Sequence, residues 1–433
     1  ASRYVGRMNA PSTSKSHISF AASTALGVGG MMGAGLYTLL GLAASRAGSL
    51  VPVAFAVGAL AASLSVYSYA KLGATFPGRG GSASFVNAAF GRSVMANGVN
   101  VFQYFGYLVA TSLYAAGFAD YAKTVLGSHA PAWTAKVAGV GVVLAFAAVA
   151  LLDAKLVGKA QAAIVGIELV ILAIFIVVGG VKSQPARLTE SMPGFVGVLT
   201  AAALLYVTYQ GFGVIANASG RMAHPARQLP RSMFTALALV AVFYIVISAI
   251  VVMVLPLPTL LADSGHALAS AAQAVAGSTG LLVMGAAALL ATASAVNATL
   301  FAATNIGLDE GDEDQLPRRI TTPVGRTGSR ALVISAAVVC VLVLVFPLDA
   351  VGSMTSMAFL LVYGVVSFGH LGLRAKTGAR AWPLIAAVAV NAVLFVFLLM
   401  DAVKRGPVGA WVTLLVALVV SFVYAKLRQR SRD

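Results

Sequence analysis

Glu168 is the residue whose type and place in this chain are best suited to chemistry. It lies near the middle of the apolar run 162–172, which contains no second charged residue. A charged side chain at the centre of a bilayer costs roughly 2.5 kcal/mol or more, so a carboxylate there is usually protonated, paired or bound to a cation. Glu168 is therefore a candidate for loading a proton or a cation.

Two glycine-rich stretches, residues 27–35 and 209–213, interrupt long apolar segments and could offer backbone groups to a ligand. Glycine weakens a helix, and lipid tolerates unpaired backbone groups only where they line a cavity or are buried in protein. For either stretch alone, close packing of small residues is an adequate explanation. Because the two stretches occupy corresponding places five segments apart, we favour two broken helices with a binding site between them.

The composition around these residues is that of a protein embedded in lipid. Of the 433 residues, 59% are hydrophobic and 10% are charged, and the mean hydropathy is +0.91. Apolar runs of about 18 residues or more recur, long enough to cross the hydrocarbon core as helices, and they do not alternate as β-barrel strands do. We expect twelve transmembrane helices at residues 18–43, 50–70, 94–122, 133–152, 156–181, 193–220, 232–255, 279–307, 330–347, 351–372, 382–401 and 408–425.

The net charge of +16 is explained by topology rather than by nucleic-acid binding. With twelve helices, both termini lie on one side, and twenty-two of the 29 Lys and Arg residues fall on that side. Lys and Arg concentrate in cytoplasmic loops, so we expect a multi-pass protein of the cytoplasmic membrane with both termini in the cytoplasm. The lipid bilayer is an expected partner, whereas nucleic acid and an obligate protein partner are not.

Neither a metal nor a cofactor is expected. The five histidines fall near predicted helix ends or in loops without the spacing of metal ligands, and Cys340 is the one cysteine. Asn297, by contrast, lies deep in an apolar segment and needs a polar partner there. A hydrogen bond between helices is its expected role.

Four motifs are similar to those of a known family. They read MGAGLYTLLG at residues 32–41, YAKL at 69–72 followed by Phe-Pro and Gly-Gly, YQGF at 209–212 followed by HPARQLP, and AVNAT at 295–299. The chain thus resembles the amino acid–polyamine–organocation (APC) permeases over residues 18–375, and most of all the broad-specificity ApcT-type amino acid transporters. It departs from the family pattern at Lys71, where a glutamate is usual.

The resemblance implies an all-α integral membrane fold with a five-plus-five inverted repeat, broken helices one and six, and two additional helices. The segments would then be a cytoplasmic tail at 1–17, a first five-helix repeat at 18–181, a second, inverted repeat at 193–372, two accessory helices at 382–425 and a basic cytoplasmic C-terminus at 426–433.

The resemblance also implies where an amino acid would bind. Its α-carboxylate would meet backbone N–H groups of the first broken helix, at Met32, Gly33, Ala34 and Gly35. Its α-ammonium would meet backbone carbonyls of the second, around Val207, Thr208, Tyr209, Gln210 and Gly211. Helix termini agree with this arrangement, because an N-terminus offers free N–H donors and partial positive charge, and unwound carbonyls at a C-terminus suit a cation.

In ApcT-like members a lysine stands where this chain has Glu168, and that departure leaves three interpretations of the glutamate open. It is a protonatable carboxyl that loads and releases H⁺, because burial favours its neutral form. Alternatively it ligates Na⁺, helped by Thr292 or Ser294 and by carbonyls from Gly27 to Gly30, since oxygen ligands suit a hard cation. Or it is a neutral buried acid that hydrogen-bonds a neighbouring helix.

The function that follows is secondary active transport of amino acids by alternating access. The resemblance implies that this transport is coupled to protons. A Na⁺-coupled or exchange-type carrier of amino acids or amines is the alternative, and a channel or a substrate sensor is the alternative of a different class. No catalytic residue or enzyme activity is expected, because Glu168 has no nucleophile or metal cluster near it in the sequence. The sequence has no phosphate-binding loop, which argues against ATP-driven transport.

Overall fold

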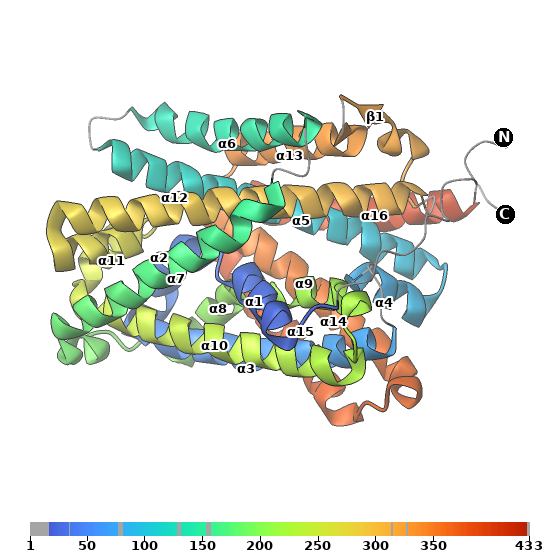
Figure 1. The fold of residues 1–433 in the computed structure, drawn as a ribbon, viewed down its shortest axis with the longest axis horizontal. Coiled ribbons are helices and arrows are strands. Elements are labelled where there is room, and N and C mark those ends of the chain that lie inside the picture. The colour runs from blue at the N-terminus through green and yellow to red at the C-terminus, as the bar shows by residue number, and fades with distance from the viewer. Residues whose placement is uncertain are drawn as a thin grey trace.

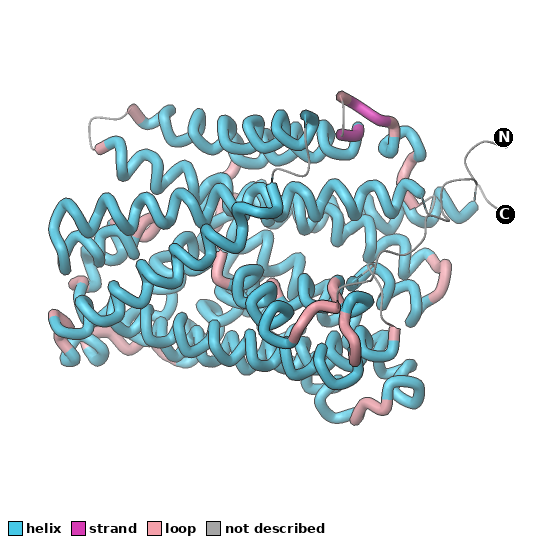
Figure 2. Tube along the Cα trace, in the orientation of Figure 1, coloured by secondary structure: helices cyan, strands magenta, loops and turns pink. Residues whose placement is uncertain are grey.

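The computed structural model describes residues 17–33, 35–76, 81–127, 131–152, 157–312, 315–325 and 328–430. Helix covers nearly all of them, and the loops are mostly short (Figure 2). The α-helices are α1 Phe20–Met31, α2 Gly35–Ala47, α3 Val51–Thr75, α4 Gly81–Phe90, α5 Val94–Leu126, α6 Ala132–Leu152, α7 Val157–Val181, α8 Phe195–Leu205, α9 Phe212–Asn217, α10 Pro225–Val254, α11 Leu257–Ala262, α12 Ala267–Asp312, α13 Arg330–Val345, α14 Leu348–Thr377, α15 Ala381–Arg405 and α16 Val408–Arg430.

Short 3-10 turns join some of these helices: η2 Gly48–Leu50, η3 Pro185–Thr189, η4 Tyr206–Tyr209, η5 Ser219–Arg221 and η6 Arg318–Thr321. One antiparallel hairpin, β1 Pro323–Val324 with β2 Gly328–Ser329, precedes α13.

The apolar segments of the sequence became the helices of a membrane bundle. Within the described residues, nine helical stretches are long and apolar enough to cross a bilayer, and α1 and α13 are shorter apolar helices. Each of the twelve expected segments coincides with one helix or with a consecutive pair of helices. The chain is thus a multi-pass membrane protein.

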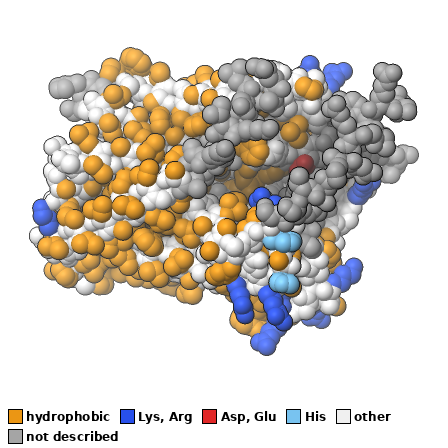
Figure 3. Space-filling view, viewed as in Figure 1, with side chains coloured by type: hydrophobic (Ala, Val, Ile, Leu, Met, Phe, Trp, Pro, Cys, Tyr) orange, Lys and Arg blue, Asp and Glu red, His pale blue; other side chains and the backbone are white. Residues whose placement is uncertain are grey.

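The long helices run side by side along the length of the molecule, and the short helices α1, α8 and α9 lie among them (Figure 1). On the face that Figure 3 shows, hydrophobic side chains are spread over the left and middle of the surface, and most Lys and Arg lie towards the right and lower right, with one group at the left end. Apolar side chains on the outside of a bundle are what contact with lipid tails requires, and the charged ends are where headgroups and water would lie.

The structure differs from the sequence-based expectation after residue 307, where the eighth expected helix ends. Helix α12 continues to Asp312, and the side chains of Glu310 and Gln315 are buried. The amide of Asn100, on α5, donates to Gln315 Oε1 at 3.0 Å. This segment therefore packs against the bundle, because its polar groups find partners on α5 that hydropathy alone does not reveal. Residues 1–16 and 431–433 of the expected tails lie outside the described residues.

Candidate functional site

The first broken helix is interrupted where the glycines predicted it. Helix α1 ends at Met31, Met32 and Gly33 are not helical, and α2 starts at Gly35. The Met32 N–H donates to Val28 O at 2.7 Å and closes α1. Ala34, an expected member of the site, lies outside the described residues.

The second broken helix is interrupted less completely than expected. Helix α8 ends at Leu205, the chain tightens into η4, and α9 begins at Phe212. The Gln210 N–H donates to Val207 O at 3.1 Å, and Gln210 O accepts from Gly213 N at 3.1 Å. Gln210 O also accepts from Tyr363 Oη at 3.4 Å and so already has two partners. Val207 O has one partner, and its second lone pair is available to a ligand.

The two interruptions meet at one place. A Cβ atom on Gly211 would overlap the carbonyl of Gly30, and one on Gly35 would come within 3.0–3.2 Å of three carbon atoms of Thr208. Glycine is required at position 211 because its Cα lies against the backbone of Gly30, whereas a Cβ at position 35 would be a tight contact with Thr208. We call the place where Gly30, Gly35, Thr208 and Gly211 meet the junction.

The junction is covered on one side and open on the other. Met32, Gly35, Val207, Thr208, Tyr209 and Gly211 are all buried. Gly30 is exposed, Gly33 is partly exposed, and Val214 on α9 is 41% exposed. Access to the junction therefore lies between α1 and α9, and the α2–α8 side is closed.

The backbone at the junction carries complementary partial charges. The first four N–H groups of an α-helix have no partner inside that helix, so the start of α2 offers donors with partial positive charge. The end of α8 with η4 offers carbonyls and partial negative charge. One side chain adds to this set: Gln210 Nε2 donates to Tyr114 Oη at 3.2 Å, and Gln210 Oε1 is buried with no hydrogen bond in the described structure. A small dipolar molecule matches these two poles.

Glu168 lies beside the junction among tyrosines. Its side chain, on α7, is 3% exposed and interacts electrostatically with the hydroxyls of Tyr37 and Tyr244. Glu168 Oε1 has no hydrogen-bond partner within the described residues, and the Tyr37 hydroxyl faces the carboxyl. Tyr244 Oη donates to Met31 O at 2.6 Å, at the end of α1. Tyr244, which lies near the carboxyl, is thus hydrogen-bonded to the end of α1.

The other residues expected at a cation site, Gly27, Thr292 and Ser294, do not contact Glu168 Oε1 through hydrogen bonds in the described structure. Gly27 faces Ile215 and Ala236, on the side of α1 that packs against α9 and α10. Thr292, on α12, uses its hydroxyl to donate to Ala288 O at 2.6 Å, and Ser294 is buried nearby on the same helix. The described structure contains no hydrogen bond from these hydroxyls to Glu168 Oε1.

Comparison with known proteins identifies the family. Residues 18–427 match the amino acid permease family over almost the whole chain. The chain belongs to this family, within the APC superfamily. It is 28% identical over 410 residues to the inner membrane transport protein YbaT of Escherichia coli, covering 94% of this chain and 95% of that protein. It is 26% identical over 437 residues to the branched-chain amino acid permease BcaP of Bacillus subtilis, covering 93% and 91%. An uncharacterised protein of Methanocaldococcus jannaschii is 29% identical over 416 residues, covering 94% and 95%. The permease is a membrane transporter and not an enzyme.

Sequence reasoning missed the tyrosines around Glu168. Tyr121 Oη donates to Tyr37 O at 3.0 Å, and the two rings meet edge to face with centroids 6.1 Å apart. Tyr37 stands within the MGAGLY motif of the permease, which is the one signal that could have drawn attention to it. Tyr121 and Tyr244 are far from that motif in sequence, so only packing brings them to it.

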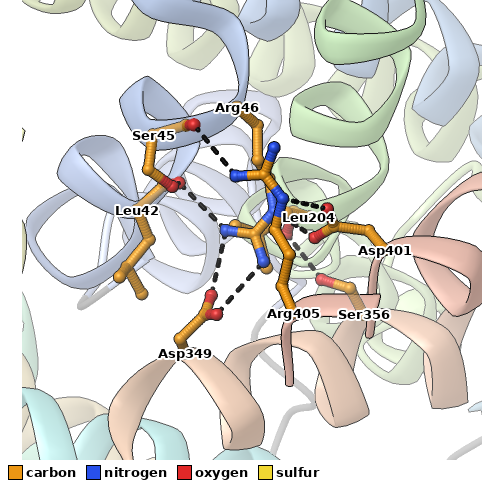
Figure 4. A network of polar contacts seen from close by, with 8 residues as sticks. All are labelled: Leu42, Ser45, Arg46, Leu204, Asp349, Ser356, Asp401 and Arg405. Carbon is orange, nitrogen blue, oxygen red and sulfur yellow. Dashed lines mark hydrogen bonds and ion pairs between the residues drawn. The ribbon is translucent and has the colours of Figure 1, made fainter. Parts of the chain in front are cut away.

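A buried ion-pair network at the far end of α2 was also missed (Figure 4). Arg46 lies between two carboxylates, with Nη1 2.9 Å from Asp349 Oδ1 and Nε 2.6 Å from Asp401 Oδ2. Arg405 Nε adds a contact of 3.1 Å to Asp401 Oδ1. Only 3% of the Arg46 side chain is exposed. The network joins α2, which forms the covered side of the junction, to α14 and to α15.

Proposed function

We propose that this permease is a secondary carrier of amino acids that works by alternating access and is coupled to protons. The observation that carries the proposal is the junction, where two broken helices touch through Gly30 and Gly211 and through Gly35 and Thr208. Backbone poles of opposite sign that lie close together suit a zwitterion without a charged side chain. The name of the Bacillus subtilis relative, a branched-chain amino acid permease, supports an amino acid as substrate.

In this proposal the substrate carboxylate binds the N–H groups at the first break, and the substrate ammonium binds carbonyls at the second. The proposed donors are the N–H groups of Met32, Gly33, Ala34 and Gly35, and the proposed acceptors are the carbonyls of residues 207–211. The buried, unpaired Gln210 Oε1 is a further acceptor beside the carbonyls.

The proposed topology has twelve transmembrane helices in the cytoplasmic membrane. Residues 18–181 and 193–372 form two inverted five-helix repeats, residues 382–425 form the accessory helices, and both termini are cytoplasmic. The bias of Lys and Arg towards one side supports this orientation. Under it, α1 and α9 are the cytoplasmic halves of the broken helices. The exposed Gly30 and Val214 then belong to a cytoplasmic opening, and the Arg46 network closes the outer side.

Glu168 is the proposed proton carrier. It is buried beside Tyr37 and near Tyr244, which donates a hydrogen bond to the carbonyl of Met31. Gain or loss of a proton at Glu168 would therefore bias the position of α1 relative to α2. A Na⁺ ion held by Glu168 with Gly27, Gly30, Thr292 and Ser294 is the alternative coupling, and uncoupled exchange is another.

Uptake into proteoliposomes tests the coupling. Wild-type permease should accumulate a labelled amino acid when a pH gradient is imposed, and Glu168→Gln should lose accumulation while it still exchanges substrate across the membrane. The matched control is Glu190→Gln, which makes the same chemical change at an exposed carboxylate. Concentrative, pH-driven uptake by Glu168→Gln at the wild-type level would refute the proton role. Accumulation driven only by a Na⁺ gradient would favour Na⁺ coupling.

A thermal-shift screen of the twenty amino acids, with and without Na⁺, tests the substrate class. Stabilisation by amino acids and not by their amides would support capture of the α-carboxylate. Flux that never exceeds equilibrium would indicate a channel, and binding without flux would indicate a sensor.

A further inference from the structure

A cavity of about 270 Å³ lies apart from the junction, between α6, α12 and α13 and beside η6 and the β1–β2 hairpin. Pockets for small ligands begin at roughly 300 Å³, so its size is close to the lower limit for a binding site. Its residues on α12 include Asn297 and Phe301. The junction instead faces α12 at Ala295, whose Cβ lies 3.6 Å from the position of a Cβ on Gly33. Positions 295 and 297 point to different sides of a helix, so the cavity is a separate feature.

The cavity has an apolar wall and unsatisfied polar groups. Phe146, Leu300, Phe301 and Leu332 are among the apolar residues that line it. The side chains of Asn297 and Asn305 line it as well, and no hydrogen bond of either amide occurs in the described structure. The helix-to-helix hydrogen bond expected for Asn297 is therefore not formed there. Two amides without partners in an apolar setting favour an occupant that supplies hydrogen-bonding groups.

The cavity adjoins the lipid-facing surface. Figure 1 shows α6 and α13 along one edge of the bundle. Apolar side chains are exposed on all three helices, with Phe301 54% exposed on α12, Val149 on α6 38% exposed and Val333 on α13 45% exposed. Exposed apolar residues on adjacent helices are what contact with acyl chains requires. An acyl chain can therefore reach the cavity from the side.

Two exposed arginines adjoin the lining residues. Arg330 is the first residue of α13, between the lining residues Ser329 and Leu332, and Arg319 lies in η6, two residues before the lining residue Thr321. Neither arginine forms an ion pair in the part of the chain that the structure describes. Five acidic residues, Asp309, Glu310, Asp312, Glu313 and Asp314, precede Arg319 in the sequence. Of these, Asp309 and Glu310 take part in other polar interactions. Arg319 and Arg330 therefore bring positive charge close to this end of the cavity.

We propose that this cavity binds an anionic phospholipid of the cytoplasmic leaflet. One acyl chain lies along Phe301 and Leu332, the ester and glycerol oxygens meet the amides of Asn297 and Asn305, and the phosphate meets Arg319 and Arg330. Basic pockets between transmembrane helices on the cytoplasmic side are known to recognise anionic headgroups.

Native mass spectrometry of the full-length permease, with dioleoyl phosphatidylglycerol or dioleoyl phosphatidylcholine added, tests the proposal. Wild type should retain phosphatidylglycerol in preference to phosphatidylcholine. Combined Arg319→Gln and Arg330→Gln should reduce that preference about 30-fold, because each basic residue near a headgroup contributes about a fivefold preference. Asn305→Phe, which places a ring in the cavity, should abolish retention of the lipid.

The matched control combines Arg374→Gln with Lys376→Gln. It removes the same charge from exposed positions at the end of α14, which does not line the cavity. Equal loss of preference in the control, or unchanged retention in Asn305→Phe, would overturn the proposal, since the lipid would then be bound elsewhere. A thermal melt of each variant shows that it is folded. If Asn305→Phe does not fold, the two paired variants still decide the outcome.

Discussion

Replacement of Arg46 by methionine tests whether the network beyond α2 stabilises the permease. Methionine keeps much of the side-chain volume and removes the contacts of 2.9 Å to Asp349 and 2.6 Å to Asp401. It also removes the hydrogen bond from Nη1 to Leu42 O at 3.0 Å. The guanidinium is the one group that connects both carboxylates to α2.

The expected cost is smaller than for a fully buried pair. Removal of one partner of a buried ion pair costs about 3–5 kcal/mol, because the remaining charge loses its compensation. Here the Asp349 side chain is 36% exposed, and Asp401 keeps Arg405 at 3.1 Å. Both features reduce the penalty, so we expect about 2–3 kcal/mol. At about 2.1 cal/mol/K of unfolding entropy for each of the 433 residues, this corresponds to a fall in Tm of about 3 °C.

Thermal unfolding in one detergent, followed by a thiol-independent fluorescence probe, measures the shift. The control is Arg405→Met, which contacts the same Asp401 but is 59% exposed and should cost about 1 kcal/mol or less. A double-mutant cycle between Arg46→Met and Asp401→Asn should give a coupling energy of at least about 1 kcal/mol. Equal melting of Arg46→Met and wild type, or equal effects of the two arginine substitutions, would refute the reasoning.

Two further substitutions test the junction. Gly211→Ala should destabilise the permease by about 3 kcal/mol or more, because its Cβ would meet the backbone of Gly30. The control Gly213→Ala, with nothing within 4 Å of its Cβ, should be neutral or stabilising by up to about 1 kcal/mol. Equal melting temperatures of the two variants would contradict the close contact at the junction. Tyr244→Phe removes the hydrogen bond of 2.6 Å to Met31 O and should lower the stability of the permease by about 1 kcal/mol. It should also slow pH-driven uptake, and uptake at the wild-type rate would argue against a link between α1 and Glu168.

The positions of the helices and of the two breaks follow from the sequence. Hydropathy summed over about 18 residues identifies membrane helices whatever they pack against. The glycines at 27–35 and 209–213 weaken the backbone locally, so the interruption after Met31 and the one after Leu205 were predicted within a few residues. The extent of the second break was not, because η4 keeps local hydrogen bonds that depend on backbone geometry.

The sequence alone could also select Glu168 as the unusual residue, because a lone carboxylate in an apolar run is visible without any partner. Its neighbours could not be selected in this way. Tyr244 lies 76 positions further along the chain than Glu168, and nothing in the spacing of the two residues relates them. Helix packing decided that its hydroxyl reaches Met31 O and that Tyr37 faces the carboxyl.

The Arg46 network and the lipid-facing cavity depend on tertiary structure for the same reason. Arg46 is separated from Asp349 and Asp401 by 303 and 355 residues, and the cavity exists only where α6, α12 and α13 leave space between them. Helix formation and membrane insertion are properties of a local segment, summed along the chain. Pairing of polar groups and the shape of a void are properties of several segments in contact, which the order of residues does not record.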